Sequence, residues 1–338
     1  MRQSLLIKPG KIELTDIPIP TPADGELLIK VKAALTCGTD LKAYRRGHPV
    51  IPMPGPFGHE FSGTVAKKGR GVRNFREGDE IMAVHSAPCL KCPHCKKRLH
   101  NLCENIMKTK VMGAFAEYVL LPAHLVKQNV FHKPSTLSYE EAALLEPFSS
   151  VVHGMVPLGI RRGATVVVIG AGPIGLIHVM LLKAVGAKVV ISDPHKERLL
   201  TATELGADVT CEPKALPEAV KKFTGGMGAD FAFECTGKPD VWQSAIGLVR
   251  RGGTVTLFGG CPPGTSVTYD TQRLHYDEIT LRGVFHFTPA DVRRAFKLLA
   301  SGRLKLGVLI SGRYPLADLG KAFDKLSKGQ GIKYAIIP

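Results

Sequence analysis

The sequence predicts an α/β protein built from a β-rich segment and a doubly wound parallel sheet. Apolar and charged residues alternate over 26–33 (ELLIKVKA), as in a strand with one buried face. From Arg161 onward short apolar runs alternate with helical patterns, beginning with 164–169 (ATVVVI), which is typical of a parallel strand covered on both faces. With 338 residues, 44% of them hydrophobic, the chain is long enough for two domains with their own cores.

The charge is strongly basic but dispersed. Lys and Arg total 45 against 29 Asp and Glu, a net charge of +16. The densest basic stretches, 67–76 and 91–98, lack the repeated aromatic residues of single-stranded nucleic-acid surfaces. We therefore expect a solvated basic surface and no nucleic-acid partner, with attraction of an anionic small molecule as the main alternative.

Nothing in the sequence predicts a membrane span or an export signal. The stretch 166–182 is apolar but is interrupted by glycines, Pro173 and His178. Residues 1–14 carry scattered charges without an apolar core. Four of the eight cysteines lie between Cys89 and Cys103, which favours metal binding in a reducing compartment. These features predict a cytoplasmic protein.

The amino-terminal segment is expected to form a small β-barrel or sandwich with functional loops. A second strand is predicted over 61–67 (FSGTVAK), and prolines and glycines mark turns in 17–22 and 49–58.

Four residues of this part offer the ligand types of an open zinc site: Cys37, His59, Glu60 and Glu146. Cys37 follows the first strand, and His59 lies 22 residues later on the loop before the second. Ser138 and Glu141 form a capping box that predicts a helix over 138–146, after a strand over 114–121. Glu146 is then either turned inward beside Pro147 or a solvated carboxylate at the end of that helix.

A lobe rich in Lys, His and Pro carries a second metal motif, Cys89-x2-Cys92-x2-Cys95-x7-Cys103. Four thiolates at this spacing can close a tetrahedral cage that leaves no open position, so the zinc here would be structural. A redox cluster or an iron–sulfur site is the alternative, although the bacterial iron–sulfur pattern has three residues before its last cysteine and a proline after it. His94 and His100 are expected on the surface.

A glycine motif follows the strand 164–169 and opens a helix reaching about Val185, and its residues are Gly170, Ala171, Gly172, Pro173, Ile174 and Gly175. A second strand, 188–192, ends at Asp193, which lies 23 residues beyond Gly170. This context is the fingerprint of a dinucleotide-binding Rossmann domain, in which glycines allow the pyrophosphate to approach a helix amino terminus.

Asp193 favours NAD over NADP. Its carboxylate can accept hydrogen bonds from a free ribose 2′-hydroxyl and would repel a 2′-phosphate. His195, Lys196 and Arg198 follow directly and keep NADP open.

Further strands are predicted over 209–211, 230–234, 254–258 and 279–284. The tail adds helices over 292–300 and 317–327 and a last strand over 333–337, which we expect to return to the first domain. The predicted domains are therefore 1–149 with 287–338, including a metal lobe at about 86–106, and 150–286.

The sequence resembles the zinc-dependent medium-chain alcohol dehydrogenase family across nearly its whole length. The matching motifs are Cys37-Gly38-Thr39-Asp40, Gly58-His59-Glu60, the four-cysteine lobe, Leu145-Glu146-Pro147, the glycine motif, Asp193 and Glu234-Cys235-Thr236-Gly237. Alcohol dehydrogenases proper hold their zinc with two cysteines and one histidine. Glu146-Pro147 instead resembles the polyol, sugar-phosphate and threonine dehydrogenase branch.

The resemblance implies a GroES-like catalytic domain beside the Rossmann domain, with two zinc ions per chain and NAD. The catalytic zinc would be held by Cys37, His59 and a carboxylate, Glu60 or Glu146, and Thr39 would begin removal of the substrate proton. Lys42 stands where many relatives carry the histidine that passes this proton to solvent, which puts the outer step of the relay in doubt. Arg198 and Thr236 complete the implied cofactor-binding set.

The function expected from these features is oxidation of a secondary alcohol, a polyol or sugar alcohol that is either neutral or phosphorylated, by a homo-oligomeric enzyme. Alternatives are a threonine-type or simple alcohol dehydrogenase, or a catalytically silent cofactor-binding relative. Several residues are open between substrate or cofactor contacts and structural roles: Tyr44, Arg45, Arg46, His48, His153, Arg273 and His275. Residues 257–260 and 283–285 are expected near the nicotinamide.

Overall fold

A computed structural model describes all 338 residues, which divide into two compact units. The first unit comprises Met1–Val152 and His286–Pro338, and the second comprises His153–Phe285. These boundaries differ from the expected ones by three residues and by one residue. None of the helices has both the length and the apolar content needed to cross a bilayer.

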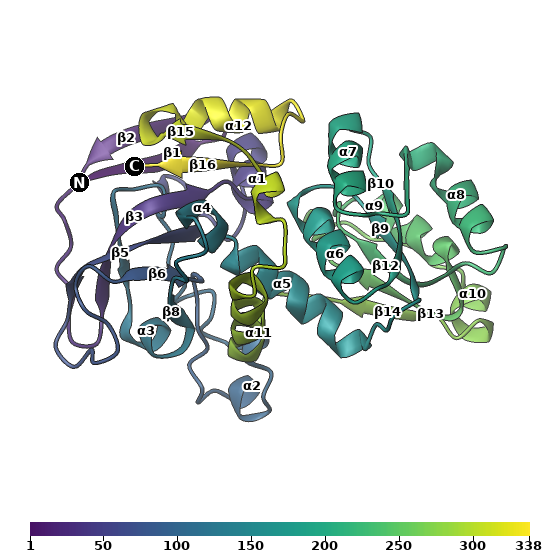
Figure 1. Ribbon diagram of the computed structural model, residues 1–338, viewed down its shortest axis with the longest axis horizontal. Helices are drawn as coiled ribbons and strands as arrows, with labels where there is room; N and C mark the ends of the chain where they lie inside the picture. Colours follow the sequence, from purple (N-terminus) through teal and green to yellow (C-terminus); the bar gives the residue numbers. More distant parts are fainter. The chain divides into compact units, whose positions relative to one another are not determined.

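The first unit is built on a seven-stranded sheet and a smaller three-stranded sheet. In the larger sheet the strand order is β15-β16-β3-β5-β6-β8, and β7 pairs with β3; the smaller sheet is β2-β1-β4. The strands are β1 (Arg2–Lys8), β2 (Lys11–Asp16), β3 (Leu27–Leu35), β4 (Gly55–Pro56), β5 (Glu60–Lys68), β6 (Glu80–Ala83), β7 (Tyr118–Leu121), β8 (Val130–His132), β15 (Ile310–Pro315) and β16 (Lys333–Ile337). The last strand of the chain thus lies between β15 and β3, as Figure 1 shows.

The helices of this unit are α1 (Gly38–Arg46), α2 (Pro93–Lys96), α3 (Ala123–Asn129), α4 (Tyr139–Ala142), α11 (Pro289–Ala300) and α12 (Leu319–Ser327). In β3 the exposed Lys30 and Lys32 alternate with buried Ile29, Val31 and Ala33, which confirms the predicted half-buried strand.

Two predicted elements of the first unit are wrong in extent. The strand expected over 114–121 covers only Tyr118–Leu121; before it, the backbone makes an isolated antiparallel bridge between Ala116 and Gln3 of β1. The helix expected over 138–146 ends at Ala142, and α5 (Leu145–Met155) begins anew. Pro147 explains the break, since it has no N–H to continue a helix but is tolerated in a first turn. The Ser138–Glu141 capping box is confirmed.

The second unit is a single six-stranded parallel sheet in the order β11-β10-β9-β12-β13-β14. By position in the unit this order is 3-2-1-4-5-6, the arrangement of a Rossmann domain, which confirms the predicted fold class. Its strands are β9 (Thr165–Ile169), β10 (Lys188–Ser192), β11 (Val209–Cys211), β12 (Ala229–Glu234), β13 (Val249–Leu257) and β14 (Thr280–Gly283). Its helices are α6 (Pro173–Ala184), α7 (Lys196–Glu204), α8 (Leu216–Phe223), α9 (Pro239–Ser244) and α10 (Thr271–Tyr276), as Figure 1 shows.

A buried histidine lies in the core between α6 and the sheet. His178 packs against Phe233 and Phe258, with ring centroids 4.4 and 5.1 Å away. Its Nδ1 lies 2.9 Å from the carbonyl oxygen of Ile174, whereas Nε2 is buried without a hydrogen-bond partner. Burial lowers the pKa of His178 to about 4, and the hydrogen bond to the carbonyl of Ile174 offsets only part of this effect.

We predict that this histidine makes the second unit acid-sensitive. The unfolded chain takes up a proton near pH 6.5 and the folded chain only near pH 4, so stability is lost as the pH falls through this window. Between pH 7 and pH 5 the free energy of unfolding should fall by roughly 2 kcal/mol more in the wild type than in His178→Leu. Urea unfolding followed by the fluorescence of Trp242, the single tryptophan, measures this. The exposed His275→Leu is the control, and equal pH slopes in all three proteins would contradict the assignment.

Candidate functional site

Helix α1 positions the first candidate ligand. Cys37 is its N-cap, and the Sγ of Cys37 lies 3.4 Å from the backbone N–H of Thr39, which donates to it. Cysteine binds metals through this sulfur atom. Thr39 therefore lies in the first helical turn, two residues from the thiol.

His59 is paired with a buried carboxylate. Its Nδ1 lies 3.3 Å from Oδ1 of Asp40, which is fully buried on α1. This pairing leaves Nε2 as the nitrogen available to a metal, an arrangement typical of zinc-binding histidines. The turn before His59 requires glycine, because Gly58 has φ +86° and a Cβ there would meet the ring of Phe115 at 2.6 Å.

Glu60 forms a buried ion pair that joins the two ends of the first unit. Nζ of Lys333 lies 2.7 and 2.5 Å from the two carboxylate oxygens of Glu60, and both side chains are 1% exposed. The same ammonium donates to the carbonyl of Thr36 at 3.0 Å, next to Cys37. Possible ligand atoms of Cys37, His59 and Glu60 lie within 4.8 Å of one another, but the carboxylate of Glu60 already has a cationic partner.

Glu146 is buried in the first turn of α5, and its Oε1 lies 3.5 Å from Nδ1 of His85. The ring of His85 is in turn 5.0 Å from that of His59. Burial raises the pKa of Glu146 to about 7, and the charge of Glu60 adds to this effect against that of His59. Burial also holds the pKa of His85 well below its ordinary range, so His85 is a neutral neighbour.

This cluster fits a divalent cation. Both oxygens of Asp40 and Nδ1 of His59 are buried without a hydrogen bond, and the three buried carboxylates of Asp40, Glu60 and Glu146 are accompanied by one buried lysine, Lys333, which pairs with Glu60. Buried charge of one sign is costly unless it is paired or coordinates a metal. Zinc in proteins is bound by cysteine sulfur, histidine nitrogen and carboxylate oxygen, and this cluster offers all three kinds of donor.

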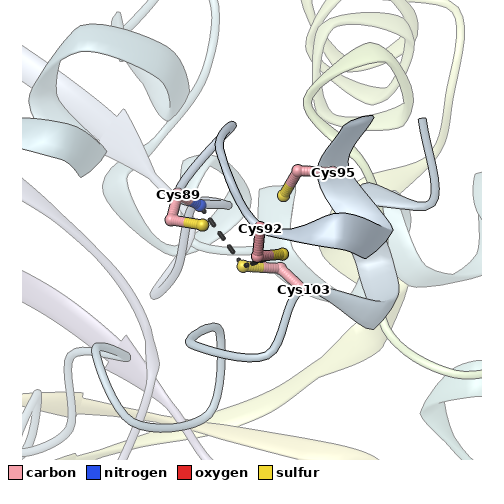
Figure 2. A group of neighbouring side chains, drawn as sticks. All are labelled: Cys89, Cys92, Cys95 and Cys103. Carbon is pink, nitrogen blue, oxygen red and sulfur yellow. Dashed lines mark hydrogen bonds between the residues drawn. The ribbon is translucent and has the colours of Figure 1, made fainter. Parts of the chain in front are cut away.

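The four lobe cysteines converge as their spacing predicts. Their sulfur atoms lie within 4.8 Å of one another, and Figure 2 shows the four side chains turned toward a common space. The N–H of Cys89 donates to Sγ of Cys103 at 3.3 Å, and the Sγ atoms of Cys92 and Cys103 are 3.9 Å apart. The geometry suits a closed tetrathiolate site.

The lobe has almost no core besides these cysteines. Its buried cluster consists of Cys92, Cys95, Cys103 and Ile106, with Cys89 and Met107 at the edge. Backbone N–H donors lower the pKa of Cys89 to about 6, whereas burial and the neighbouring thiols raise the pKa of Cys95 to about 12. A central divalent cation would let all four ionise together. His94, by contrast, is exposed beside Glu104, in keeping with a surface role.

In the second unit the glycine motif connects β9 to α6. Gly170 has φ +102°, and a Cβ on Gly175 would lie 1.8 Å from the carbonyl oxygen of Gly170. No side chain is tolerated at either position, which keeps the turn tight. Helix α6 then begins at Pro173, with Gly172 as its N-cap, so Ile174 is in its first turn.

Asp193 is buried at the end of β10 and bound by the chain itself. Its Oδ2 accepts from the N–H of Ala171 at 2.8 Å, and its Oδ1 accepts from the N–H of His195 at 2.9 Å. The carboxylate therefore lies directly against the glycine motif. Arg198 follows in the first turn of α7, and Lys196 is exposed.

Thr236 lies after β12, where Glu234 shapes the turn. The carboxylate of Glu234 accepts from the backbone N–H of Thr236 at 2.7 Å and from that of Gly237 at 3.1 Å, and the hydroxyl of Thr236 also donates to it. The expected nicotinamide neighbours 257–260 and 283–285 lie at the carboxyl ends of β13 and β14.

For several residues the sequence left two roles open, contact with the substrate or a purely structural role. The structure shows the surroundings of each. The hydroxyl of Tyr44 donates to Asp324 at 2.9 Å, and its ring stacks on Phe323. Arg45 and Arg46 are exposed at the end of α1, and His48 lies half-buried after it.

Arg273 binds within the second unit, to Asp277 and to the carbonyl of Val249, and His275 is exposed beside Tyr276. His153 is the first residue of the second unit. Tyr44 and Arg273 therefore have structural partners.

Sequence reasoning missed Asp40, His85 and Lys333 as parts of the site. Asp40 is part of the Cys37 motif, but the motif alone assigned it no role. Its position as the third residue of a helix that begins beside a candidate ligand could have pointed to one. Lys333 had no signal, because its partner lies 273 residues away.

We predict that Cys103→Ser removes one zinc per chain and leaves the other. Without this zinc ion the remaining cysteines of the lobe are no longer held together. The lobe should therefore become sensitive to proteolysis near 86–106, and the melting temperature should fall. Metal analysis and limited proteolysis check this. Cys211→Ser in the second unit should keep two zinc ions, and a wild-type protein with a single zinc would contradict the assignment.

We also predict that Lys333→Met destabilises the first unit by about 3–5 kcal/mol, because it leaves the carboxylate of Glu60 buried and unpaired. The double variant Lys333→Met/Glu60→Gln removes both charges and should recover most of this loss. Chemical denaturation followed by circular dichroism measures both. Equal stability of the single and double variants would show that the ion pair is not the cause.

Known families match both units. Residues 23–132 match the family model of the alcohol dehydrogenase GroES-like domain, and 173–301 match that of the zinc-binding dehydrogenases. The chain is 31% identical to sorbitol dehydrogenase of Bacillus subtilis, covering 100% of this chain and 97% of that one. It is 35% identical to L-threonine 3-dehydrogenase of Bacillus velezensis, covering 96% and 95%.

A solved structure shares the whole fold. A Sinorhizobium meliloti 1021 protein assigned as a zinc-binding dehydrogenase and solved bound to NADP superposes with a TM-score of 0.88, at 32% identity over 100% of this chain and 99% of the other. The two domain matches, this shared fold and the convergence of the candidate metal ligands all indicate the same family. The protein is an oxidoreductase and belongs to the zinc-dependent medium-chain alcohol dehydrogenase family, in the branch of the sorbitol and threonine dehydrogenases.

Proposed function

We propose that this enzyme oxidises a secondary alcohol, a polyol or sugar alcohol, to the ketone with reduction of NAD to NADH and release of one proton. The convergence of Cys37, His59 and Glu60, with Asp40 paired to His59 and Glu146 buried nearby against His85, carries the proposal. Its thiol, imidazole and carboxylate donors resemble the polyol branch more than the two-cysteine set of alcohol dehydrogenases proper. The similarity to a sorbitol dehydrogenase over the full chain supports this substrate class.

Cys37 and His59 would hold the zinc, and a carboxylate would complete the set. Both carboxylates remain candidates, but Glu60 is neutralised by Lys333 whereas the neighbour of Glu146 is the neutral His85. We therefore assign Glu146 to the metal and Glu60 to the ion pair. When bound, zinc supplies a Lewis acid that favours ionisation of the substrate hydroxyl, and NAD supplies the hydride acceptor.

The chain's own residues orient the substrate and move its proton. The hydroxyl of Thr39, two residues from Cys37, would accept the proton from the substrate hydroxyl. The proton then passes outward to solvent; Lys42 occupies the next turn of α1, where many relatives have a histidine. Asp40 fixes the ring of His59, so the ligand geometry is set before substrate arrives.

For the cofactor we propose NAD. The carboxylate of Asp193 lies against the glycine motif, where it would meet an adenosine ribose and repel a 2′-phosphate. The NADP-bound relative makes NADP the specific alternative, and Arg198 is the residue that would serve it.

A threonine-type activity is the second candidate function. Its support is the 35% identity to a threonine dehydrogenase, and the two candidates differ in whether the substrate carries an ammonium and a carboxylate.

We predict NADH formation from polyols by the zinc-loaded enzyme, with a higher kcat/KM than for threonine or primary alcohols. Thr39→Val should lower kcat about 100-fold or more, because it removes the first proton acceptor, and Thr39→Ser should restore most of it. Absorbance of the reduced cofactor, with NAD and NADP compared in parallel, gives all of these values. A protein that binds two zinc ions but oxidises no alcohol would overturn the proposed function, and a preference for NADP would overturn the assignment of Asp193.

A further inference from the structure

One lysine near the metal cluster is half-buried and has no carboxylate partner. Nζ of Lys110 donates to the carbonyl oxygen of Val50 and forms no ion pair within 4.0 Å. Burial lowers the pKa of Lys110, since the ammonium has lost water without gaining a carboxylate in return. An ammonium has three N–H donors, so one carbonyl leaves two of them for another acceptor.

Lys110 is joined to the loop that follows α1. The N–H of Val50, whose carbonyl binds Lys110, donates to Nδ1 of His48 at 3.4 Å. Because Nδ1 accepts this bond, a neutral His48 carries its proton on Nε2 and can donate it. The loop 48–51 thus provides an imidazole N–H from His48, and the neighbouring segment provides the ammonium N–H groups of Lys110.

The same segment is tied to the candidate metal site. Val111, the next residue, donates its N–H to the carbonyl of His85 at 2.7 Å, and His85 lies against Glu146. Burial, followed by the charges of His59, His286 and Lys110, lowers the pKa of His85. Asp40 is the one carboxylate whose charge acts on Lys110, and Asp40 is already paired with His59. The positive charge of Lys110 therefore lies close to the metal cluster without belonging to it.

We propose that Lys110, assisted by His48, binds an anionic group of the substrate, so that the preferred substrates are hydroxy compounds carrying a phosphate or a carboxylate. This inference rests on the proposed oxidation of secondary alcohols and names the substrate class for that site. It assigns to Lys110 the role of a specificity-determining residue that contacts the substrate away from the reacting carbon. His85, which is 6% exposed, connects the segment of Lys110 to Glu146, since its backbone accepts from Val111, next to Lys110, and its ring lies against Glu146.

The structural alternative is that Lys110 only ties two loops together. In that case a neutral substitution would affect neutral and anionic substrates alike. Binding of an anion predicts a selective effect, because a charged hydrogen bond is lost only with the anionic substrate. Tyr44 does not compete for this role, since its hydroxyl is bound to Asp324.

The test compares a hexitol, its terminal phosphate ester and the corresponding aldonate on the zinc-loaded enzyme with NAD. We expect kcat/KM to be at least about tenfold higher for one of the two anions than for the hexitol, and the two arms distinguish phosphate from carboxylate. Lys110→Met should lower this preference about 10- to 100-fold, mainly through KM, as expected for a lost charged hydrogen bond. Lys110→Arg should keep most of it. Lys108→Met is the matched control, an exposed lysine on the same segment, and should leave the preference unchanged.

A preference for the neutral hexitol, or a ratio unaffected by Lys110→Met, would overturn the inference while leaving the proposed function intact. Calorimetric binding of the phosphate ester to the wild type and to Lys110→Met provides a second readout. If no alcohol is oxidised but the ester binds and Lys110→Met abolishes binding, the proposed function fails and the anion site stands. Equal binding to both proteins would reject the anion site.

Discussion

The buried ion pair between Glu60 and Lys333 is the interaction on which the first unit depends. It joins the start of β5 to the start of β16, two strands that flank β3 on opposite sides. Lys333 also holds the carbonyl of Thr36, and the backbone of Tyr334 exchanges hydrogen bonds with Thr36. The end of the chain therefore fixes the segment that leads into Cys37. The same pairing neutralises one of two carboxylates near the candidate metal cluster, whereas the other, Glu146, has the neutral His85 as its neighbour.

The two candidate metal sites of the first unit differ in how their ligands are held. The lobe site is made of four cysteines that are also the core of the lobe, so its geometry is complete only with a cation at its centre. The candidate ligands of the other site come from the N-cap of α1, the turn before β5 and the start of α5, each held by its own packing and hydrogen bonds. A site whose ligands are positioned independently of the metal can leave one coordination position to substrate.

In the second unit the candidate dinucleotide-binding surface is formed largely by the backbone of a tight glycine turn. The absence of side chains at Gly170 and Gly175 allows the tight turn between β9 and α6, and Asp193 anchors that turn from the neighbouring strand. His178, on the same helix, is fully buried, and this burial lowers its pKa to about 4, so the packing favours the neutral ring. The candidate dinucleotide surface and the predicted acid sensitivity of the unit thus involve the same tightly packed helix.

The sequence alone determined what depends on neighbours along the chain. The spacing of Cys89, Cys92, Cys95 and Cys103 predicted their convergence, and the run from β9 through the glycine motif to Asp193 predicted the Rossmann unit, because such motifs are complete within a few dozen residues. Gly58-His59-Glu60 also indicated a ligand pair. Only the tertiary structure gave Glu60 a buried lysine partner and Glu146 a histidine neighbour, gave Tyr44 and Arg273 structural partners, and left Lys110 without a carboxylate. These outcomes depend on side chains that meet from distant segments, and no local pattern records such meetings.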